Sequence, residues 1–285
     1  MDASNHDSRQ QNPRRRGPAY SDFGVVLRSY RLGESDKLLR IMTREHGKRS
    51  AVAKGVRRTG SKFGASLELL TCSRLLVHSG RNLDTVRQAQ IENSFQTLRE
   101  DLDLFMYASA MAELVDGAMH EKEPHPEVFD LLVSSLGLLA GYPARASFLL
   151  AFFDFKVLSV TGYQLHVTAC SACGEVFEER NPLFSLGSGG LVCPACRSGG
   201  EVAGRTLRLK GETVSLLAWM VDHQPGQWPE AVPAPGVRAE TMMLMDKVVE
   251  YWTEREFRCR KVMRAVPGPA GNRRGRGQSN GPQHA

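Results

Sequence analysis

Short runs in which hydrophobic and polar positions alternate occupy the first third of the chain. Gly, Asp, Asn or Glu residues separate these runs, which are rich in Val, Leu, Ile and Thr. The five predicted strands are 23–30, 36–43, 49–55, 67–79 and 81–92. So many short strands in so short a stretch favour a small barrel, and the five-stranded OB-fold is the natural candidate.

Near Thr97 the repeat of apolar residues changes from every two residues to about every 3.6 residues, which predicts helices. One helix face between residues 98 and 120 carries Leu98, Leu102, Phe105, Met106, Ala110 and Leu114. Further helices are predicted at 127–141, 144–162, 212–222 and 239–257. Segment 144–162 is apolar on almost every side, so we expect it to be buried at the centre of a helical domain.

These patterns predict an α+β protein with an N-terminal five-stranded OB-fold β-barrel and an all-helical domain. We expect the barrel at 19–96 and the helical domain at 97–265, with a Cys-containing insert at 168–200. The polar segments 1–18 and 266–285 are predicted to be disordered basic tails. No apolar run is long enough to span a membrane and no export signal is visible, so we expect a cytoplasmic protein without a membrane partner. If it binds nucleic acid, we expect it to be nucleoid-associated.

Two Cys pairs in the insert, CSACGE and CPACRS, have metal-ligand spacing. They contain Cys170, Cys173, Cys193 and Cys196, in the pattern C-x2-C-x19-C-x2-C. Each tight turn directs two sulfurs at one ion, which is typical of zinc sites, although iron uses the same shell. A closed shell of four thiolates leaves no position for water, so we predict a structural zinc ion. Cys72 and Cys259 are predicted to be packed side chains.

The net charge of +6 conceals a strong asymmetry along the chain. Residues 14–62 carry a net +10, residues 63–254 a net −10 and residues 255–285 a net +7. A basic front segment indicates a polyanionic partner, and a solvated basic surface is the plainer alternative.

The predicted nucleic-acid site lies in this basic segment, where no acidic residue occurs between Glu45 and Glu68. Its predicted centre consists of Lys48, Arg49, Lys54, Arg57 and Arg58. Its predicted margins consist of Arg28, Lys37, Arg40 and Lys62. The stretch AKGVRRTGSKFG resembles a loop that presents cations to phosphates. Aromatic residues for base stacking are few, so we expect phosphate contacts rather than base-specific contacts.

Motifs for catalysis are missing from the sequence. There is no G-x-x-x-x-G-K-[ST] loop for nucleotide phosphates and no G-x-S-x-G nucleophile turn. A zinc deaminase is excluded as well, because its His/Cys/Cys shell would leave Cys170 and Cys173 unexplained. We therefore expect a protein that is not an enzyme.

The stretch GVVLRSYRLGESDKLLRIMTREHGKRSAVAKGVRR resembles the RecO family of bacterial recombination mediators, and the resemblance extends over roughly residues 20–260. It implies an N-terminal OB-fold, a helical domain and an inserted zinc module. It also implies binding to single- and double-stranded DNA, annealing of complementary strands, and help in loading RecA onto SSB-coated strands with RecR in the RecF pathway. The SSB C-terminal tail is expected to dock on the helical domain, where Arg145 is one candidate contact.

Two other functions are consistent with parts of the sequence. A zinc-ribbon transcriptional regulator would read nucleic acid with the Cys module itself, and a pure scaffold would use the basic front only for solvation. The charged residues between Cys173 and Cys193 are three Glu residues and Arg180, which argues against a nucleic-acid-reading ribbon. The mediator is therefore the leading hypothesis.

Overall fold

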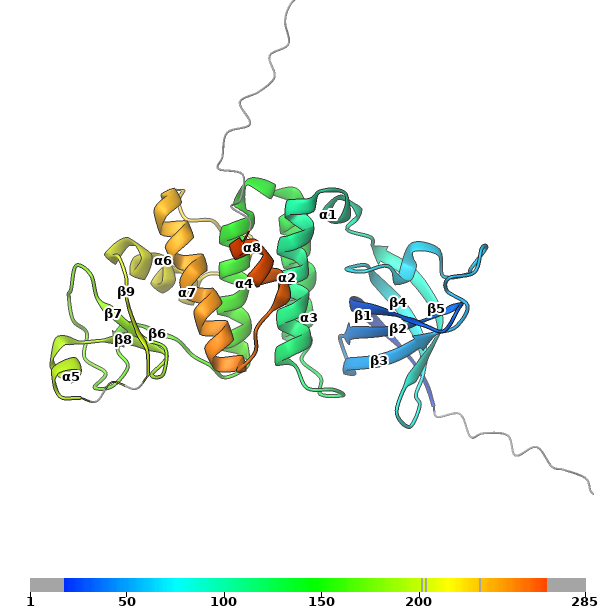
Figure 1. The fold of residues 1–285 in the computed structure, drawn as a ribbon, viewed down its shortest axis with the longest axis horizontal. Helices are drawn as coiled ribbons and strands as arrows, with labels where there is room; N and C mark the ends of the chain where they lie inside the picture. Colours follow the sequence, from blue (N-terminus) through cyan, green and yellow to red (C-terminus); the bar gives the residue numbers. More distant parts are fainter. Residues whose placement is uncertain (1–17, 201, 203, 231, 266–285) are drawn as a thin grey trace, which may run out of the picture.

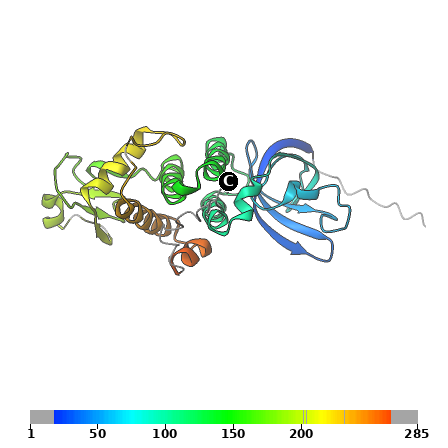
Figure 2. The ribbon, with the colours of Figure 1, turned by 90° about the horizontal axis from the view of Figure 1, so that it is seen from above.

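The computed structural model describes residues 18–200, 202, 204–230 and 232–265, and it contains a barrel, a helical domain and a small Cys module in a row (Figure 1). Figure 2 shows the same arrangement from above. Apart from Pro18, the predicted disordered segments 1–18 and 266–285 lie outside the described residues.

The predicted five-stranded barrel is confirmed. Its strands are β1 (Ala19–Leu32), β2 (Asp36–Thr43), β3 (Gly47–Ala53), β4 (Cys72–His78) and β5 (Asp84–Asn93). They close in the order β1-β2-β3-β5-β4, with β3 and β5 parallel and the other pairs antiparallel. Gly24 allows this closure, because a Cβ there would lie 2.7 Å from side-chain atoms of both Ile41 and Leu75.

The predicted strand at 67–79 is shorter in the structure. Residues Gly64–Leu67 form a 3-10 turn, η1, and β4 begins only at Cys72. Leu70 between them has a φ of 66°, a left-handed conformation that interrupts an extended strand. The side chain of Leu70 is nevertheless fully buried, so the hydrophobic pattern continues across a break in the backbone.

The helical domain surrounds one buried helix. Its helices are α1 (Gln96–Glu100), α2 (Leu102–Ala118), α3 (Pro126–Gly141), α4 (Ala146–Val160), α6 (Gly211–Asp222), α7 (Pro235–Thr253) and α8 (Arg258–Ala265), with a short 3-10 turn, η2 (Pro143–Arg145). Helix α4 contacts α2, α3 and α7 (Figure 1). Its side chains Phe148, Leu149, Phe152, Phe153 and Phe155 are all buried, which confirms α4 as the centre of the core.

The predicted helix 98–120 is divided at Asp101, which corrects the expectation for Leu102. Asp101 has extended backbone angles, and its carboxylate accepts the N–H groups of Asp103 and Leu104 at the start of α2. The break places Leu102 on the surface, where 74% of it is exposed. The apolar face of the sequence therefore does not run unbroken through this region.

The predicted helix 239–257 is also different, because α7 begins at Pro235 and ends at Thr253. Glu254 has a φ of 52°, and the chain then turns into α8. This short helix is fixed by Arg260, which is only 1% exposed and forms ion pairs with Asp154 of α4 at 2.6 Å and Asp246 of α7 at 2.5 Å. The separate α8 thus closes the core of the helical domain.

The Cys module lies at the end of the helical domain that faces away from the barrel (Figure 1). It contains β6 (His166–Cys170), β7 (Leu183–Ser185), β8 (Gly190–Val192), α5 (Pro194–Ser198) and β9 (Thr206–Arg208). The sheet order is β6-β8-β7-β9, so the paired strands extend beyond the expected 168–200 on both sides.

No single helix in the described part of the chain is long and apolar enough to cross a membrane. Helices α3 and α4 with the intervening turn satisfy the length and composition criteria only together, and they are bent by 117° at their junction. Burial of α4 in the helical core accounts for its apolar composition.

Candidate nucleic-acid surface, interdomain joint and metal centre

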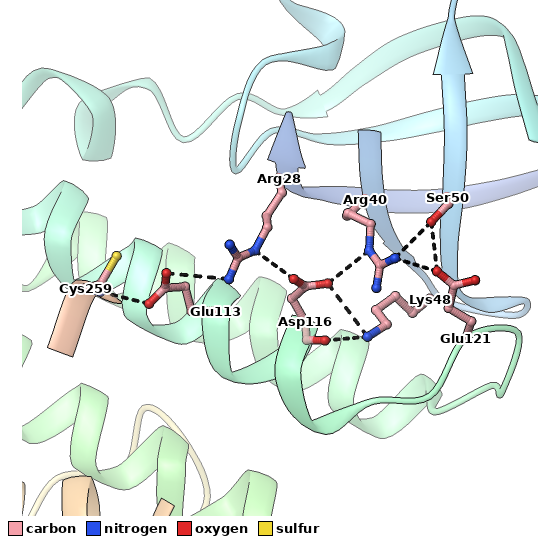
Figure 3. A network of polar contacts seen from close by, with 8 residues as sticks. All are labelled: Arg28, Arg40, Lys48, Ser50, Glu113, Asp116, Glu121 and Cys259. Atoms are coloured by element: carbon pink, nitrogen blue, oxygen red, sulfur yellow. Dashed lines mark hydrogen bonds and ion pairs between the residues drawn. The ribbon is translucent and has the colours of Figure 1, made fainter. Parts of the chain in front are cut away.

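Three of the predicted DNA-binding cations form ion pairs with the helical domain (Figure 3). Arg28, Arg40 and Lys48 lie on the adjacent strands β1, β2 and β3, and Asp116 of α2 contacts all three. The distances to its carboxylate are 2.7 Å from Arg28 Nε, 3.2 Å from Arg40 Nε and 3.7 Å from Lys48 Nζ. We call this contact region the interdomain joint.

Two further carboxylates complete the joint. Glu113 of α2 lies 3.5 Å from Arg28 Nη2, and its other oxygen accepts the backbone N–H of Cys259 in α8 at 2.9 Å. Glu121, in the connection after α2, lies 2.6 Å from Arg40 Nη1 and accepts the hydroxyl of Ser50 at 2.8 Å (Figure 3). The joint therefore links the barrel to α2 and, through Glu113, to the last described helix.

The turn between β2 and β3 fits closely against the α2–α3 connection. Lys48 is 4% exposed, and its ammonium group donates to the backbone carbonyl of Asp116. Burial lowers the pKa of Lys48, although the nearby Asp116 carboxylate acts in the opposite direction. Gly47 has a φ of 69°, and a Cβ at this position would lie 2.0 Å from the carbonyl oxygen of Glu123. Only glycine, which has no Cβ, allows the backbone to pass this close to the Glu123 carbonyl.

Apolar contacts accompany the ion pairs at the joint. Val25, Leu27 and Met42 of the barrel belong to the same buried cluster as the core of the helical domain. Removing this apolar surface from water stabilises the contact independently of charge. The barrel and the helical domain are therefore held together by a buried interface as well as by ion pairs.

Two other predicted DNA-binding residues pair within the barrel. Arg49 Nε lies 2.7 Å from the buried carboxylate of Asp84, which also accepts the hydroxyl of Tyr20 at 3.0 Å. Lys37 Nζ lies 3.2 Å from Glu68, which is largely exposed. Both cations already have a partner carboxylate.

The remaining predicted cations, Lys54, Arg57, Arg58 and Lys62, are exposed on the loop between β3 and η1. We call residues 54–62 the basic loop. The Arg57 N–H donates to Ser35 O at 3.0 Å, and the Gly55 N–H donates to Asp36 Oδ1 at 2.8 Å, so the loop is fixed against the β1–β2 turn. Its cations form no ion pair with any residue that the structure describes.

Arg31 was not among the predicted site residues, but the structure places it near the basic loop. It is exposed, and its backbone lies opposite that of Lys37 in the β1–β2 pairing. The signal that could have identified it is strand register, because the turn at residues 33–35 brings the ends of both strands together.

The four predicted metal ligands come together in one place. The sulfurs of Cys170, Cys173, Cys193 and Cys196 all lie within 4.8 Å of one another. Cys173 Sγ and Cys193 Sγ are 3.8 Å apart, which matches the edge of about 3.8 Å for a tetrahedron with metal–sulfur bonds of about 2.3 Å. Gly174, with a φ of 76°, closes the first turn. This donor set fits a zinc ion.

Backbone N–H groups surround these sulfurs. Cys193 N–H donates to Cys170 Sγ and Cys196 N–H donates to Cys193 Sγ, both at 3.4 Å. Burial raises the pKa of Cys170, but the N–H groups of Cys173, Cys193 and Ala172 outweigh it and lower the pKa to about 6. These N–H groups therefore favour the thiolate form of Cys170, which is the form that metals bind. Cys72 and Cys259 lie outside it, as predicted.

Arg145, the candidate contact for an acidic tail, lies over an aromatic ring. Its guanidinium is 4.2 Å from the ring centroid of Trp228, which also contacts Tyr142 and Phe148. The cation therefore has a cation–π contact that holds it at the start of α4.

A closed five-stranded barrel joined to a helical domain with a four-cysteine module defines a class of multidomain protein with an OB-type barrel. The family described as "Recombination protein O N terminal" matches residues 19–95, and "Recombination protein O C terminal" matches residues 99–260. The chain therefore belongs to the RecO family.

Full-length relatives agree with this assignment. The DNA repair protein RecO of Desulfitobacterium hafniense strain Y51 is 40% identical over 249 residues, which cover 82% of this chain and 88% of the relative. The DNA repair protein RecO of Frankia casuarinae is 36% identical, over 85% of this chain and 97% of the relative. That of Bifidobacterium adolescentis is 33% identical, over 86% and 99%.

Proposed function

We propose that this protein is a DNA-binding recombination mediator of the RecF pathway. In this proposal it binds and anneals DNA strands and helps to load RecA onto SSB-coated single strands. Membership of a family whose relatives are named DNA repair proteins supports a role in repair. The observation that carries DNA binding is the basic loop, whose exposed cations lie together without paired carboxylates.

The proposed DNA surface is narrower than the basic segment of the sequence. It consists of Lys54, Arg57, Arg58 and Lys62, with Arg31 beside them, and Lys37 is left out because it pairs with Glu68. Arg28, Arg40 and Lys48 are left out because carboxylates of the helical domain already contact them, and Arg49 because it pairs with Asp84. Phosphates would have to displace those carboxylates. In the basic loop, Arg57 and Lys62 donate only to neutral backbone carbonyls, of Gly33, Glu34 and Arg87, which a phosphate displaces more easily.

Arg57→Ala combined with Arg58→Ala tests this surface by filter binding to single strands across a salt series. We expect weaker binding that is nearly uniform across sequences, because phosphates are contacted rather than bases. The salt slope should fall by up to about 1.4, since each lost phosphate contact contributes about 0.7 on single strands.

The matched control is Arg205→Ala with Arg208→Ala, which removes two exposed cations from the Cys module. It should leave the slope unchanged. An unchanged slope for the loop variant, or an equal loss in the control, would show that the basic loop is not the DNA site.

The partners proposed for this activity are single- and double-stranded DNA, RecR and the SSB tail, with RecA acting downstream. Annealing of complementary oligonucleotides, with and without SSB, tests the mediator proposal directly. Faster annealing of SSB-coated strands supports it, and annealing of bare strands alone contradicts it. Arg145→Ala should weaken binding of an SSB tail peptide if the cation over Trp228 receives the acidic tail.

We also propose that the metal at the four-cysteine site is zinc and that its role is structural. The four sulfurs would fill every tetrahedral position, so none is left for a water or a substrate. The site would hold β6 and β8 to α5, because its ligands come from the ends of these elements.

A further inference from the structure

The helical domain contains a groove at the edge of its core and outside the proposed DNA surface. It has a volume of about 590 Å³ and lies where the first turns of α2 and α4 approach α7 and α8. Met106, Met242 and Met263 line it from three different helices, together with Leu102 and Val262. Methionine side chains are flexible and polarizable, so they adapt to varied apolar partners.

Apolar side chains at this groove are exposed beyond what the fold requires. Leu102 is 74% exposed and Val262 is 48% exposed. Single exposed apolar residues are common on protein surfaces, but these two line the same concave site. Burial of such a site against a partner would remove both side chains from water.

The charged side chains that line the groove are Asp101 and Asp103. Oδ1 of Asp101 caps α2, whereas Oδ2 has no hydrogen-bond partner within the described ranges. Asp103 forms no ion pair with a described residue. Helix capping accounts for Asp101, and Asp103 in the first turn of α2 stabilises the helix dipole. Both carboxylates also line the groove, so they give it a negative charge.

We propose that this groove docks a cationic amphipathic segment of another protein. Apolar side chains of the segment would enter among the methionines, and its Lys or Arg side chains would face Asp101 and Asp103. This is the arrangement in which an amphipathic helix lies in an apolar groove. An acidic segment would place like charges at close range, which disfavours it. The proposal is independent of DNA binding by the basic loop.

The test uses the full chain and two labelled amphipathic peptides that share one leucine pattern, with Lys at every polar position in one and Glu in the other. Fluorescence anisotropy at physiological salt measures their binding. We expect the Lys peptide to bind at least about tenfold more tightly than the Glu peptide. Leu102→Ser with Asp103→Lys should weaken the Lys peptide by about tenfold or more.

The matched control is Ile91→Ser with Glu92→Lys, which makes equivalent changes at exposed positions of β5. It should bind the Lys peptide like the unmodified protein. Both variants should keep the fold and the DNA affinity of the parent, because neither pair belongs to the core or to the basic loop. Asp103→Lys should lower the thermal stability slightly, because it replaces an acid in the first turn of α2 with a cation.

Three results would overturn the proposal. The first is equal binding of the Lys and Glu peptides, and the second is an equal loss in the groove and control variants. The third comes from a chain that ends at Ala265. If this shortened chain bound the Lys peptide at least about tenfold more tightly than the full chain, the protein's own basic C-terminal segment would be the ligand of the groove, because its removal would end the competition with the peptide.

Discussion

Lys48 and Lys54 lie six residues apart in one basic stretch, but their side chains have different surroundings. Lys48 is buried against Asp116, whereas Lys54 is exposed on the basic loop. Lys48 and Ser50 are two residues apart on β3, so their side chains share the face that meets the joint, whereas Lys54 follows the end of β3. Arg28 and Arg40 lie opposite Ser50 across β1 and β2 and contact the same joint. At the scale of the residue, position on a sheet face decides what a cation binds.

Gly47→Ala should destabilise the joint. The left-handed backbone alone costs an alanine about 1–2 kcal/mol, and the clash with the Glu123 carbonyl adds to this cost. Gly33→Ala is the control, because Gly33 has a similar φ of 60° with no atom near its Cβ position. Urea unfolding should show a clearly larger loss at Gly47, and equal losses would mean that the turn is not closely packed.

Asp116→Ala should cost about 3–5 kcal/mol, because it leaves Lys48 buried without its carboxylate and removes a partner of Arg28 and Arg40. Asp130→Ala is the comparison, since the exposed Arg44–Asp130 pair is expected to contribute about 0–1 kcal/mol. Thermal unfolding of both variants measures this. Equal effects would show that Asp116 pairs as an ordinary surface residue.

At the scale of the element, the apolar segment around α4 was the most predictable part of the helical domain. A helix that is hydrophobic on every side has to be surrounded by other elements, and α4 is packed between α2, α3 and α7. The ends of helices were less predictable. The breaks at Asp101 and Glu254 depend on capping and on a left-handed residue, which a hydrophobic period does not report.

Helix α8 provides the clearest test at this scale. Arg260→Leu leaves the carboxylates of Asp154 and Asp246 buried without a cation and should cost about 3–5 kcal/mol near neutral pH. Burial raises the pKa of Asp154 to about 6 even with Arg260 present, and it also raises the pKa of Asp246. Without the guanidinium, both pKa values should rise further.

The sign of the pH dependence follows from these raised pKa values. An acid that binds a proton more readily in the folded state stabilises the fold as the pH falls through its folded pKa. The variant should therefore recover stability in urea unfolding as the pH falls through the raised folded pKa values towards about 4, the pKa of an unfolded aspartate. Arg264→Leu, which breaks the exposed pair with Glu250, should change stability by no more than about 1 kcal/mol. A pH-independent loss for Arg260→Leu would contradict the prediction.

At the scale of the whole molecule, the basic front and the acidic middle of the chain meet in space. Part of the opposite charge of the two segments is neutralised at the joint, where Glu113, Asp116 and Glu121 form ion pairs with cations of the barrel (Figure 3). The barrel and the Cys module lie at opposite ends of the helical domain, so the two candidate sites are far apart in the fold (Figure 1).

Metal loss should affect one end of this molecule. Cys170→Ser should release the metal and loosen β6 and β8, because the ion would tie the ends of both strands to α5 in addition to their sheet pairing. Metal analysis and hydrogen exchange measure this, with Cys259→Ser as a control that should keep the metal. Full metal content in Cys170→Ser would show that the ligand assignment is wrong. Faster hydrogen exchange in the barrel would show that the effect of metal loss is not confined to the Cys module.

The sequence alone determined the order of the parts, the five strands, the buried α4 and the four sulfur ligands. These features depend on the spacing of apolar residues and of cysteines along the chain, which is independent of tertiary contacts. Tertiary structure decided which cations remain free. Arg28, Arg40 and Lys48 acquire carboxylate partners more than 60 residues away in the chain, whereas the basic loop does not. Pairing between distant segments depends on how two domains dock, and neither charge density nor hydrophobic period contains that information.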